Sequence, residues 1–126
     1  MNNFIDSSAW IEYFRGKQKY LFINDLIYTN AICTNDLILA ELLPSIIHRK
    51  EHHLAELLDN VMKYELIIDW QEIQNIQMLN LKHGNSNIGI SDIIIAQNCM
   101  HNDLKIIAHD KHFMAMAKYL PIKIFV

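Results

Sequence analysis

Residues 3–14 decide how the rest of the chain is organised, and they read Asn3-Phe4-Ile5-Asp6-Ser7-Ser8-Ala9-Trp10-Ile11-Glu12-Tyr13-Phe14. A short apolar run ends in a carboxylate, and two hydroxyl residues that can cap a helix come directly before an amphipathic run. The pattern predicts a strand, an acid and then a helix whose Trp10 and Phe14 face a sheet together, because they lie four residues apart. Asp6 should therefore lie at the carboxyl end of a strand, the edge at which open α/β sheets usually bind ligands.

Length and composition limit the number of domains, the location of the protein and the state of its cysteines. The 126 residues are enough for one domain with its own core and too few for two, so we expect a single domain over residues 1–126. No stretch approaches the roughly 18 apolar residues of a membrane span, and the N-terminus lacks a signal-peptide pattern, which favours a cytoplasmic location. Cys33 and Cys99 are isolated in apolar stretches and are expected to be buried, reduced thiols.

Short β-branched runs alternate with longer helical patterns along the chain. After the first strand, further strands are predicted at residues 31–34, 66–68, 105–108 and 122–126. Helices are predicted at about residues 7–14, 18–29, 36–48, 50–62, 71–83, 92–101 and 111–119, with Asn35 and Ser91 as caps of the third and sixth. This alternation predicts an α/β fold, a doubly wound parallel sheet with helices on both faces.

Two acids stand out inside helical patterns. Glu41 has apolar neighbours on both sides in residues 37–43, and a buried carboxylate needs an ionic partner or a metal. The alternative is a Glu at the edge of its helix face that reaches solvent or a Lys. Asp92 opens the apolar run of residues 93–96, although the helix dipole alone favours a carboxylate in a first turn.

Asp110 follows a predicted strand in the same way as Asp6, so two parallel strands would bring both acids to one edge of the sheet. The alternative for Asp110 is an ordinary N-cap of the last helix. Asp69 also follows a predicted strand, but that strand should lie at the sheet margin, and Asp69 is interpreted as a helix cap.

Taken together, the segments that carry Asp6, Glu41, Asp92 and Asp110 can converge. Two like charges about 4 Å apart repel by up to about 4 kcal/mol at an effective dielectric near 20. A cluster of this kind requires a hard cation, and all-oxygen ligands suit Mg²⁺ or Mn²⁺.

At this point the chain resembles the PIN-domain ribonucleases. The resemblance lies in residues 6–11, in Glu41 within the helix after the second strand, in Asp92 before its apolar run, and in Asp110 with Phe113. The compact length is similar to that of VapC-type toxins of bacterial toxin–antitoxin pairs. The resemblance implies a PIN-like sheet with strand order 3-2-1-4-5, Mg²⁺- or Mn²⁺-dependent endonucleolytic cleavage of RNA, homodimerisation, and neutralisation by a small antitoxin protein.

The predicted site has four catalytic, metal-binding acids and three supporting residues. The acids are Asp6, Glu41, Asp92 and Asp110, and the supporting residues are Ser7, Ser8 and His112. Relatives often carry a hydroxyl two residues before the last acid and a further Asp two residues after it, where this chain has Ala108 and His112. His112 is therefore expected to be supporting rather than essential.

Basic residues at two turns could bind RNA phosphates, and the alternative is that both turns are simply solvated. They are Arg15, Lys17 and Lys19 after the first helix, and Arg49 and Lys50 at the later turn. The helices near residues 18–29 and 50–62 are apolar enough to leave surface for a second copy or an antitoxin.

Rival functions come from other classes. A receiver-like phosphoacceptor signalling domain has a similar length and a strand-end Asp, but it needs a second acid where Ser7 stands. A non-catalytic, PIN-like module that binds RNA or a partner is the other rival. A metal-free, histidine-based ribonuclease is a further alternative, but only His109 and His112 of this chain lie near the predicted site. The absence of a Gly-rich loop argues against nucleotide hydrolysis.

Overall fold

A five-stranded parallel sheet forms the centre of the computed structural model, which describes residues 2–126. Its order is β3-β2-β1-β4-β5, and every neighbouring pair is parallel. The strands are β1 (Asn3–Ile5), β2 (Ile32–Thr34), β3 (Met62–Lys63), β4 (Lys105–Ile107) and β5 (Lys123–Ile124). The predicted fold class and strand order are confirmed.

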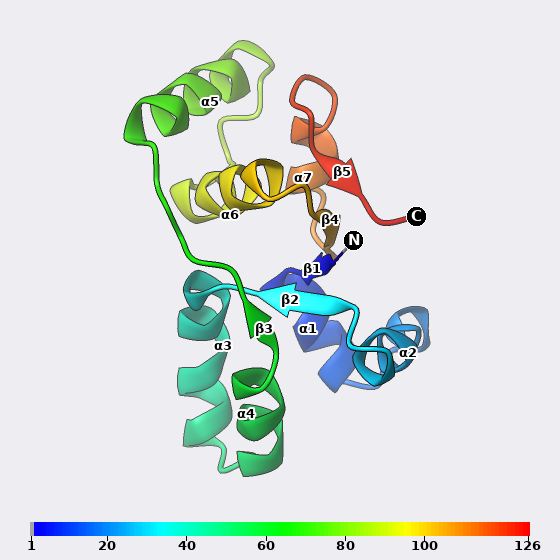
Figure 1. Ribbon diagram of the computed structural model, residues 1–126. Helices are drawn as coiled ribbons and strands as arrows, with labels where there is room; N and C mark the ends of the chain where they lie inside the picture. The colour runs from blue at the N-terminus through cyan, green and yellow to red at the C-terminus, as the bar shows by residue number, and fades with distance from the viewer. Residues whose placement is uncertain (1) are drawn as a thin grey trace.

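Helices connect the strands and cover the sheet. Within residues 2–126 they are α1 (Ser7–Phe14), the short 3₁₀ helix η1 (Gln18–Tyr20), α2 (Ile23–Tyr28), α3 (Asp36–His48), α4 (His52–Asp59), α5 (Trp70–Lys82), α6 (Ile90–His101) and α7 (His112–Met116). In Figure 1 the pair α3 and α4 and the pair α5 and α6 lie on opposite sides of β1 and β2. No helix in residues 2–126 has the length and apolar character needed to cross a membrane.

The core is built mainly from the central strands and the helix faces that cover them. Phe4, Ile5 and Ile106 are fully buried, and so is Trp10, which stacks on the half-buried Phe14 with ring centroids 5.4 Å apart. The prediction that these two rings pack inward together is confirmed. Cys33 and Cys99 are buried and free, as predicted.

The third strand was predicted in the wrong place. It lies at Met62–Lys63 rather than at residues 66–68, where Ile67 is 71% exposed. Two buried amides of α6 hold this connection instead: Asn98 Nδ2 donates to the Glu65 carbonyl at 3.0 Å. Gln97 accepts from the Asp69 amide at 3.2 Å and donates to the Asp69 carbonyl at 3.0 Å. These side-chain bonds satisfy backbone groups that a strand would satisfy with its neighbour.

Several predicted helix boundaries also require correction. The sixth helix begins at Ile90 with Gly89 as its N-cap, so Ser91 lies inside the first turn and is not the cap. The helix predicted over residues 18–29 is divided into η1 and α2, and the last helix ends at Met116. The predicted caps Asn35 and Asp69 are confirmed, because each accepts a hydrogen bond from a backbone amide three residues later.

Candidate metal centre

Parallel pairing of β1 with β4 brings two predicted site acids to the same edge of the sheet. Ile5 lies opposite Ile107, and the Asp6 amide donates to the Ile107 carbonyl at 2.9 Å. Asp6 is 2% exposed and caps α1 by accepting from the Ser8 amide at 3.2 Å. The first acid is therefore fixed by the sheet and by the start of α1, next to the loop that carries Asp110.

The Ser8 hydroxyl joins the two strand ends. It donates to Asp6 Oδ2 at 2.6 Å and accepts from the backbone amides of His109 and Asp110 at 2.9 and 3.3 Å. The donor and both acceptor positions of this hydroxyl are therefore occupied by protein groups. Ser8 therefore sets how the Asp6 carboxylate sits relative to the Asp110 loop.

Asp6 is a carboxyl that the fold keeps in an unfavourable environment. Burial raises the pKa of Asp6 from its ordinary value of 3.8 to about 7, and the charges of Asp110 and Asp92 act in the same direction against the hydrogen bonds from Ser8. No Lys or Arg in residues 2–126 forms an ion pair with any of the four predicted site acids. A cation bound beside Asp6 would stabilise its ionised form.

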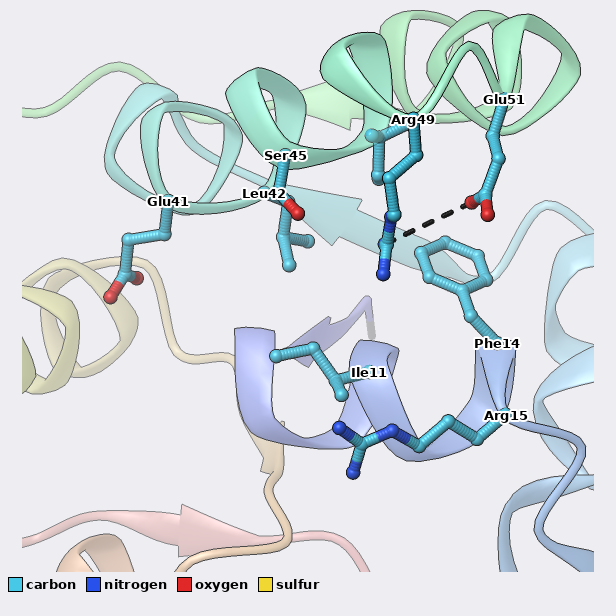
Figure 2. A pocket seen from close by; sticks show the side chains of 9 residues that line it. Ile11, Phe14, Arg15, Glu41, Leu42, Ser45, Arg49 and Glu51 are labelled. Atoms are coloured by element: carbon cyan, nitrogen blue, oxygen red, sulfur yellow. Dashed lines mark ion pairs between the residues drawn. The ribbon is translucent and has the colours of Figure 1, made fainter.

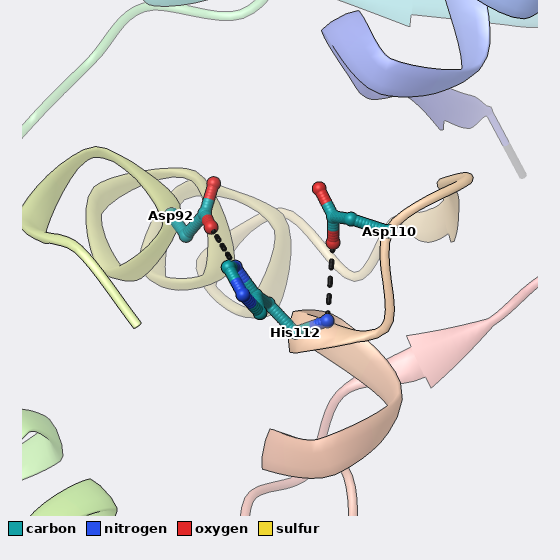
Figure 3. A group of neighbouring side chains, drawn as sticks. All are labelled: Asp92, Asp110 and His112. Carbon is teal, nitrogen blue, oxygen red and sulfur yellow. Dashed lines mark hydrogen bonds and ion pairs between the residues drawn. The ribbon is translucent and has the colours of Figure 1, made fainter. Parts of the chain in front are cut away.

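Within residues 2–126, Asp92, Asp110 and His112 form a group of possible metal ligands. One ligand atom from each lies within 4.8 Å of the others. His112 Nδ1 is 2.6 Å from Asp92 Oδ2, and the His112 amide donates to Asp110 Oδ1 at 3.1 Å. Figure 3 shows the three side chains converging from α6, from the loop after β4 and from the start of α7.

Glu41 approaches this group from α3, but it is exposed rather than buried as expected. Its helix also exposes Ala40 and Pro44, so apolar neighbours in the sequence did not require Glu41 to face the core. Ser7 Oγ donates to Glu41 Oε1 at 3.4 Å. Partial enclosure of the carboxylate raises the pKa of Glu41, and the charge of Asp92 raises it further.

The donor set fits a divalent cation. Carboxylate oxygens suit Mg²⁺ and Mn²⁺, whereas an imidazole nitrogen suits transition metals. Asp6 remains a buried acid with Asp92 and Asp110 close enough to raise its pKa, which is the condition that a bound cation relieves.

Of the five basic residues predicted to bind phosphates, the structure brings Arg15 and Arg49 together. Both line a hollow of about 380 Å³ between α1 and α3, with Glu41 at one end (Figure 2). Each guanidinium has an acidic neighbour: Arg15 pairs with Glu12 at 3.2 Å, and Arg49 lies 3.9 Å from Glu51. Lys17, Lys19 and Lys50 do not line this hollow.

The residues that hold His109 had no role in the sequence-based prediction. Tyr20, which is 4% exposed, places its hydroxyl 3.0 Å from His109 Nδ1, and Glu12 Oε1 lies 4.0 Å from Nε2. Tyr20 and His109 are 89 positions apart, so spacing gives no signal of the contact.

The buried amides Gln97 and Asn98 were detectable in principle, because they interrupt the apolar face of α6.

Comparison with known proteins identifies the family of the chain. The PIN domain family model matches residues 4–119 of the chain. No curated protein matches the sequence. Among solved structures, the DNA-bound VapBC from Salmonella typhimurium is similar, with a TM-score of 0.73 and 18% sequence identity, over 99% of this chain and 98% of that chain. The structural likeness shows a shared fold. The family model spans most of the chain, and this chain therefore belongs to the PIN domain family.

Proposed function

We propose that the protein is a divalent-metal-dependent endoribonuclease and the toxin of a bacterial toxin–antitoxin pair. The observation that carries this proposal is the grouping of acids at one edge of the sheet: Asp6 is 2% exposed, and donor atoms of Asp92, Asp110 and His112 lie within 4.8 Å of one another. Burial and the charges of Asp110 and Asp92 raise the pKa of Asp6, so its ionised form is costly without a cation. A fold that tolerates such a cost at one edge of its sheet gains when a cation binds there.

In this proposal Asp6, Glu41, Asp92 and Asp110 would hold Mg²⁺ or Mn²⁺. When bound, such a cation would lower the pKa of a coordinated water and would offset negative charge on the phosphate during in-line attack. Ser8 keeps Asp6 Oδ2 engaged and orients the Asp110 loop, while Ser7 orients Glu41. No protein nucleophile is needed for this chemistry.

The family and the surface of the protein support the proposed substrate and partners. Arg15 and Arg49 would bind phosphates of the RNA backbone on the Glu41 side of the site. The similar VapBC structure motivates a small antitoxin as the protein partner, and exposed apolar side chains such as Tyr28 and Ile47, which are 92% and 53% exposed, offer surface for it or for a second copy. We place the nuclease in the cytoplasm as a single domain over residues 1–126.

Cleavage of RNA in the presence and absence of divalent cations tests the nuclease. Asp6→Asn, Glu41→Gln and Asp92→Asn should each abolish cleavage while leaving the fold intact, because neutral amides relieve repulsion but no longer bind the cation. Asp59→Asn and Glu56→Gln, on exposed positions of α4, are matched controls and should cleave normally. Near-normal activity in any two of the three site variants would refute the site assignment.

The toxin role has a separate test. Expression of the chain alone should arrest bacterial growth, expression of Asp92→Asn should not, and co-expression of a cognate antitoxin should relieve the arrest. If expression of the wild-type protein left bacterial growth unchanged although the purified protein cleaved RNA, the toxin role would be contradicted and the nuclease proposal would stand.

A further inference from the structure

We infer that His112 is itself a ligand of the cation, so that the centre combines a nitrogen donor with carboxylates and prefers a first-row transition cation to Mg²⁺. The inference rests on the proposed metal-binding function, and it specifies which cation the site takes. It assigns His112 a direct contact with the metal, where the sequence suggested only a supporting role.

The first argument is how firmly the ring is placed. The backbone amide of His112 donates to Asp110 Oδ1 at 3.1 Å, which fixes the start of α7 against the last acid. The ring then points at the first turn of α6, with Nδ1 2.6 Å from Asp92 Oδ2. Figure 3 shows the His112 ring pointing toward the Asp92 carboxylate, and the His112 side chain is 32% exposed.

The second argument is the spacing of the donor atoms. With metal–ligand bonds of about 2.1 Å, neighbouring ligands of an octahedral ion lie about 3 Å apart and opposite ligands about 4.2 Å apart. One donor atom each from Asp92, Asp110 and His112 already lies within 4.8 Å of the other two. Small side-chain rotations would therefore place all three around one ion.

The third argument is the chemistry of the donors. An imidazole nitrogen strengthens binding of transition cations, whose affinity rises from Mn²⁺ through Fe²⁺ and Co²⁺, and it adds little for Mg²⁺, which prefers oxygen. Mn²⁺ is the weakest binder of that series, so a preference for Mn²⁺ over Mg²⁺ is a conservative test.

A competing arrangement makes a different prediction. His112 could donate its Nδ1 proton to Asp92 and orient that carboxylate without touching the ion, as outer ligands of metal sites commonly do. Replacement of His112 would then weaken every divalent cation to a similar extent. Direct ligation instead weakens transition cations selectively.

The experiment uses the full chain loaded with Mn²⁺ and measures two quantities. Pulsed electron paramagnetic resonance detects ¹⁴N coupling between bound Mn²⁺ and an imidazole, and calorimetry gives the dissociation constants for Mn²⁺ and Mg²⁺. We expect ¹⁴N coupling in the wild type, its loss in His112→Ala, and its retention in His109→Ala, which removes the adjacent imidazole that is held by Tyr20.

The affinities should change in the same pattern. His112→Ala should weaken Mn²⁺ binding by about tenfold or more and Mg²⁺ binding by less than about threefold, and His112→Asp should shift the preference toward Mg²⁺ by restoring an oxygen donor. His112→Asp also keeps the test open if the alanine variant fails to fold.

The absence of ¹⁴N coupling in Mn²⁺-loaded wild type would overturn the inference, and so would equal weakening of Mn²⁺ and Mg²⁺ in His112→Ala. RNA cleavage, measured in parallel, separates the two proposals. A nuclease without nitrogen coupling would refute only the role of His112, whereas coupling in a protein that cuts no RNA with any cation would refute only the proposed function.

Discussion

Replacement of Asp6 by Asn should stabilise the metal-free protein at high pH, although it removes a proposed cation ligand. Asp6 is 2% exposed, and burial is the main reason that its pKa is raised to about 7. Ionising this carboxyl therefore costs more free energy in the folded protein than in the unfolded chain.

The sign and size follow from the two pKa values. The folded protein keeps the Asp6 proton up to about pH 7, whereas the unfolded chain releases it near its ordinary value of 3.8. Stability contributed by the protonated group is therefore complete below pH 4 and is lost as the pH rises to about 7, with a total loss of roughly 4 kcal/mol in the free energy of unfolding. Asp6→Asn carries no such proton, so this loss should be absent.

Urea unfolding in the presence of a chelator, at several pH values from 4 to 8, measures the difference. We expect Asp6→Asn to exceed the wild type by about 2 to 4 kcal/mol at pH 8 and to be no more stable at pH 4. Asp59→Asn, an exposed acid on α4, should follow the wild-type curve. Parallel pH curves for Asp6→Asn and wild type, or a less stable variant at pH 8, would refute the reasoning.

Further predictions concern the hydrogen bonds around the site and the cation itself. Ser8→Ala removes a hydroxyl that makes three hydrogen bonds, so it should lower the free energy of unfolding by about 1 to 3 kcal/mol and weaken cation binding. Ser8→Thr keeps the hydroxyl and should retain cation affinity. Wild-type cation affinity of Ser8→Ala in calorimetry would contradict this prediction. Asn98→Ala leaves the Asn35 amide and the Glu65 carbonyl without partners and should cost about 2 to 4 kcal/mol in urea unfolding, while Asn87→Ala, at an exposed loop position, should cost about 0.5 kcal/mol or less. Equal costs would show that the buried bonds contribute little. Mn²⁺ at a hundredfold excess over its dissociation constant should stabilise the wild type by about 2.7 kcal/mol, and an unchanged melting temperature would argue against a shared site.

The sequence predicted those parts of the fold that depend on local signals. Strand β1, Asp6 and helix α1 follow one another within a dozen residues, and the alternation of apolar runs with amphipathic segments was sufficient for the sheet class. Asn35 and Asp69 were identified as caps because a cap is a local hydrogen bond between residues three positions apart in the sequence.

The failures depend on contacts between distant segments. Residues 66–68 have the composition of a strand, but Gln97 and Asn98 bind the flanking backbone from α6, 28 and 33 positions away. Glu41 lies among apolar residues in the sequence, yet its helix has apolar residues on an exposed face as well, so sequence neighbours did not report burial.

The candidate site shows the same division. Asp6, Asp92 and Asp110 were selected from local signals, because the end of a parallel strand or the start of a helix fixes where each lies. Glu41 was selected because its sequence neighbours are apolar, and this reason did not hold in the structure. The contact of His112 with Asp92 and the bridge from Ser8 to the Asp110 loop span 20 and 102 positions, and neither is visible as a spacing. These two contacts therefore became visible only in the structure.

The chemical nature of the RNA ends produced by cleavage tests the central claim most directly. If a metal-activated water attacks the phosphate, mass spectrometry of the fragments should show one hydroxyl end and one phosphate monoester end, with no 2′,3′-cyclic phosphate, and cleavage should stop when the cation is chelated. A 2′,3′-cyclic phosphate formed in the presence of chelator, with Asp92→Asn as active as the wild type, would contradict the account and favour metal-free chemistry by His109 or His112.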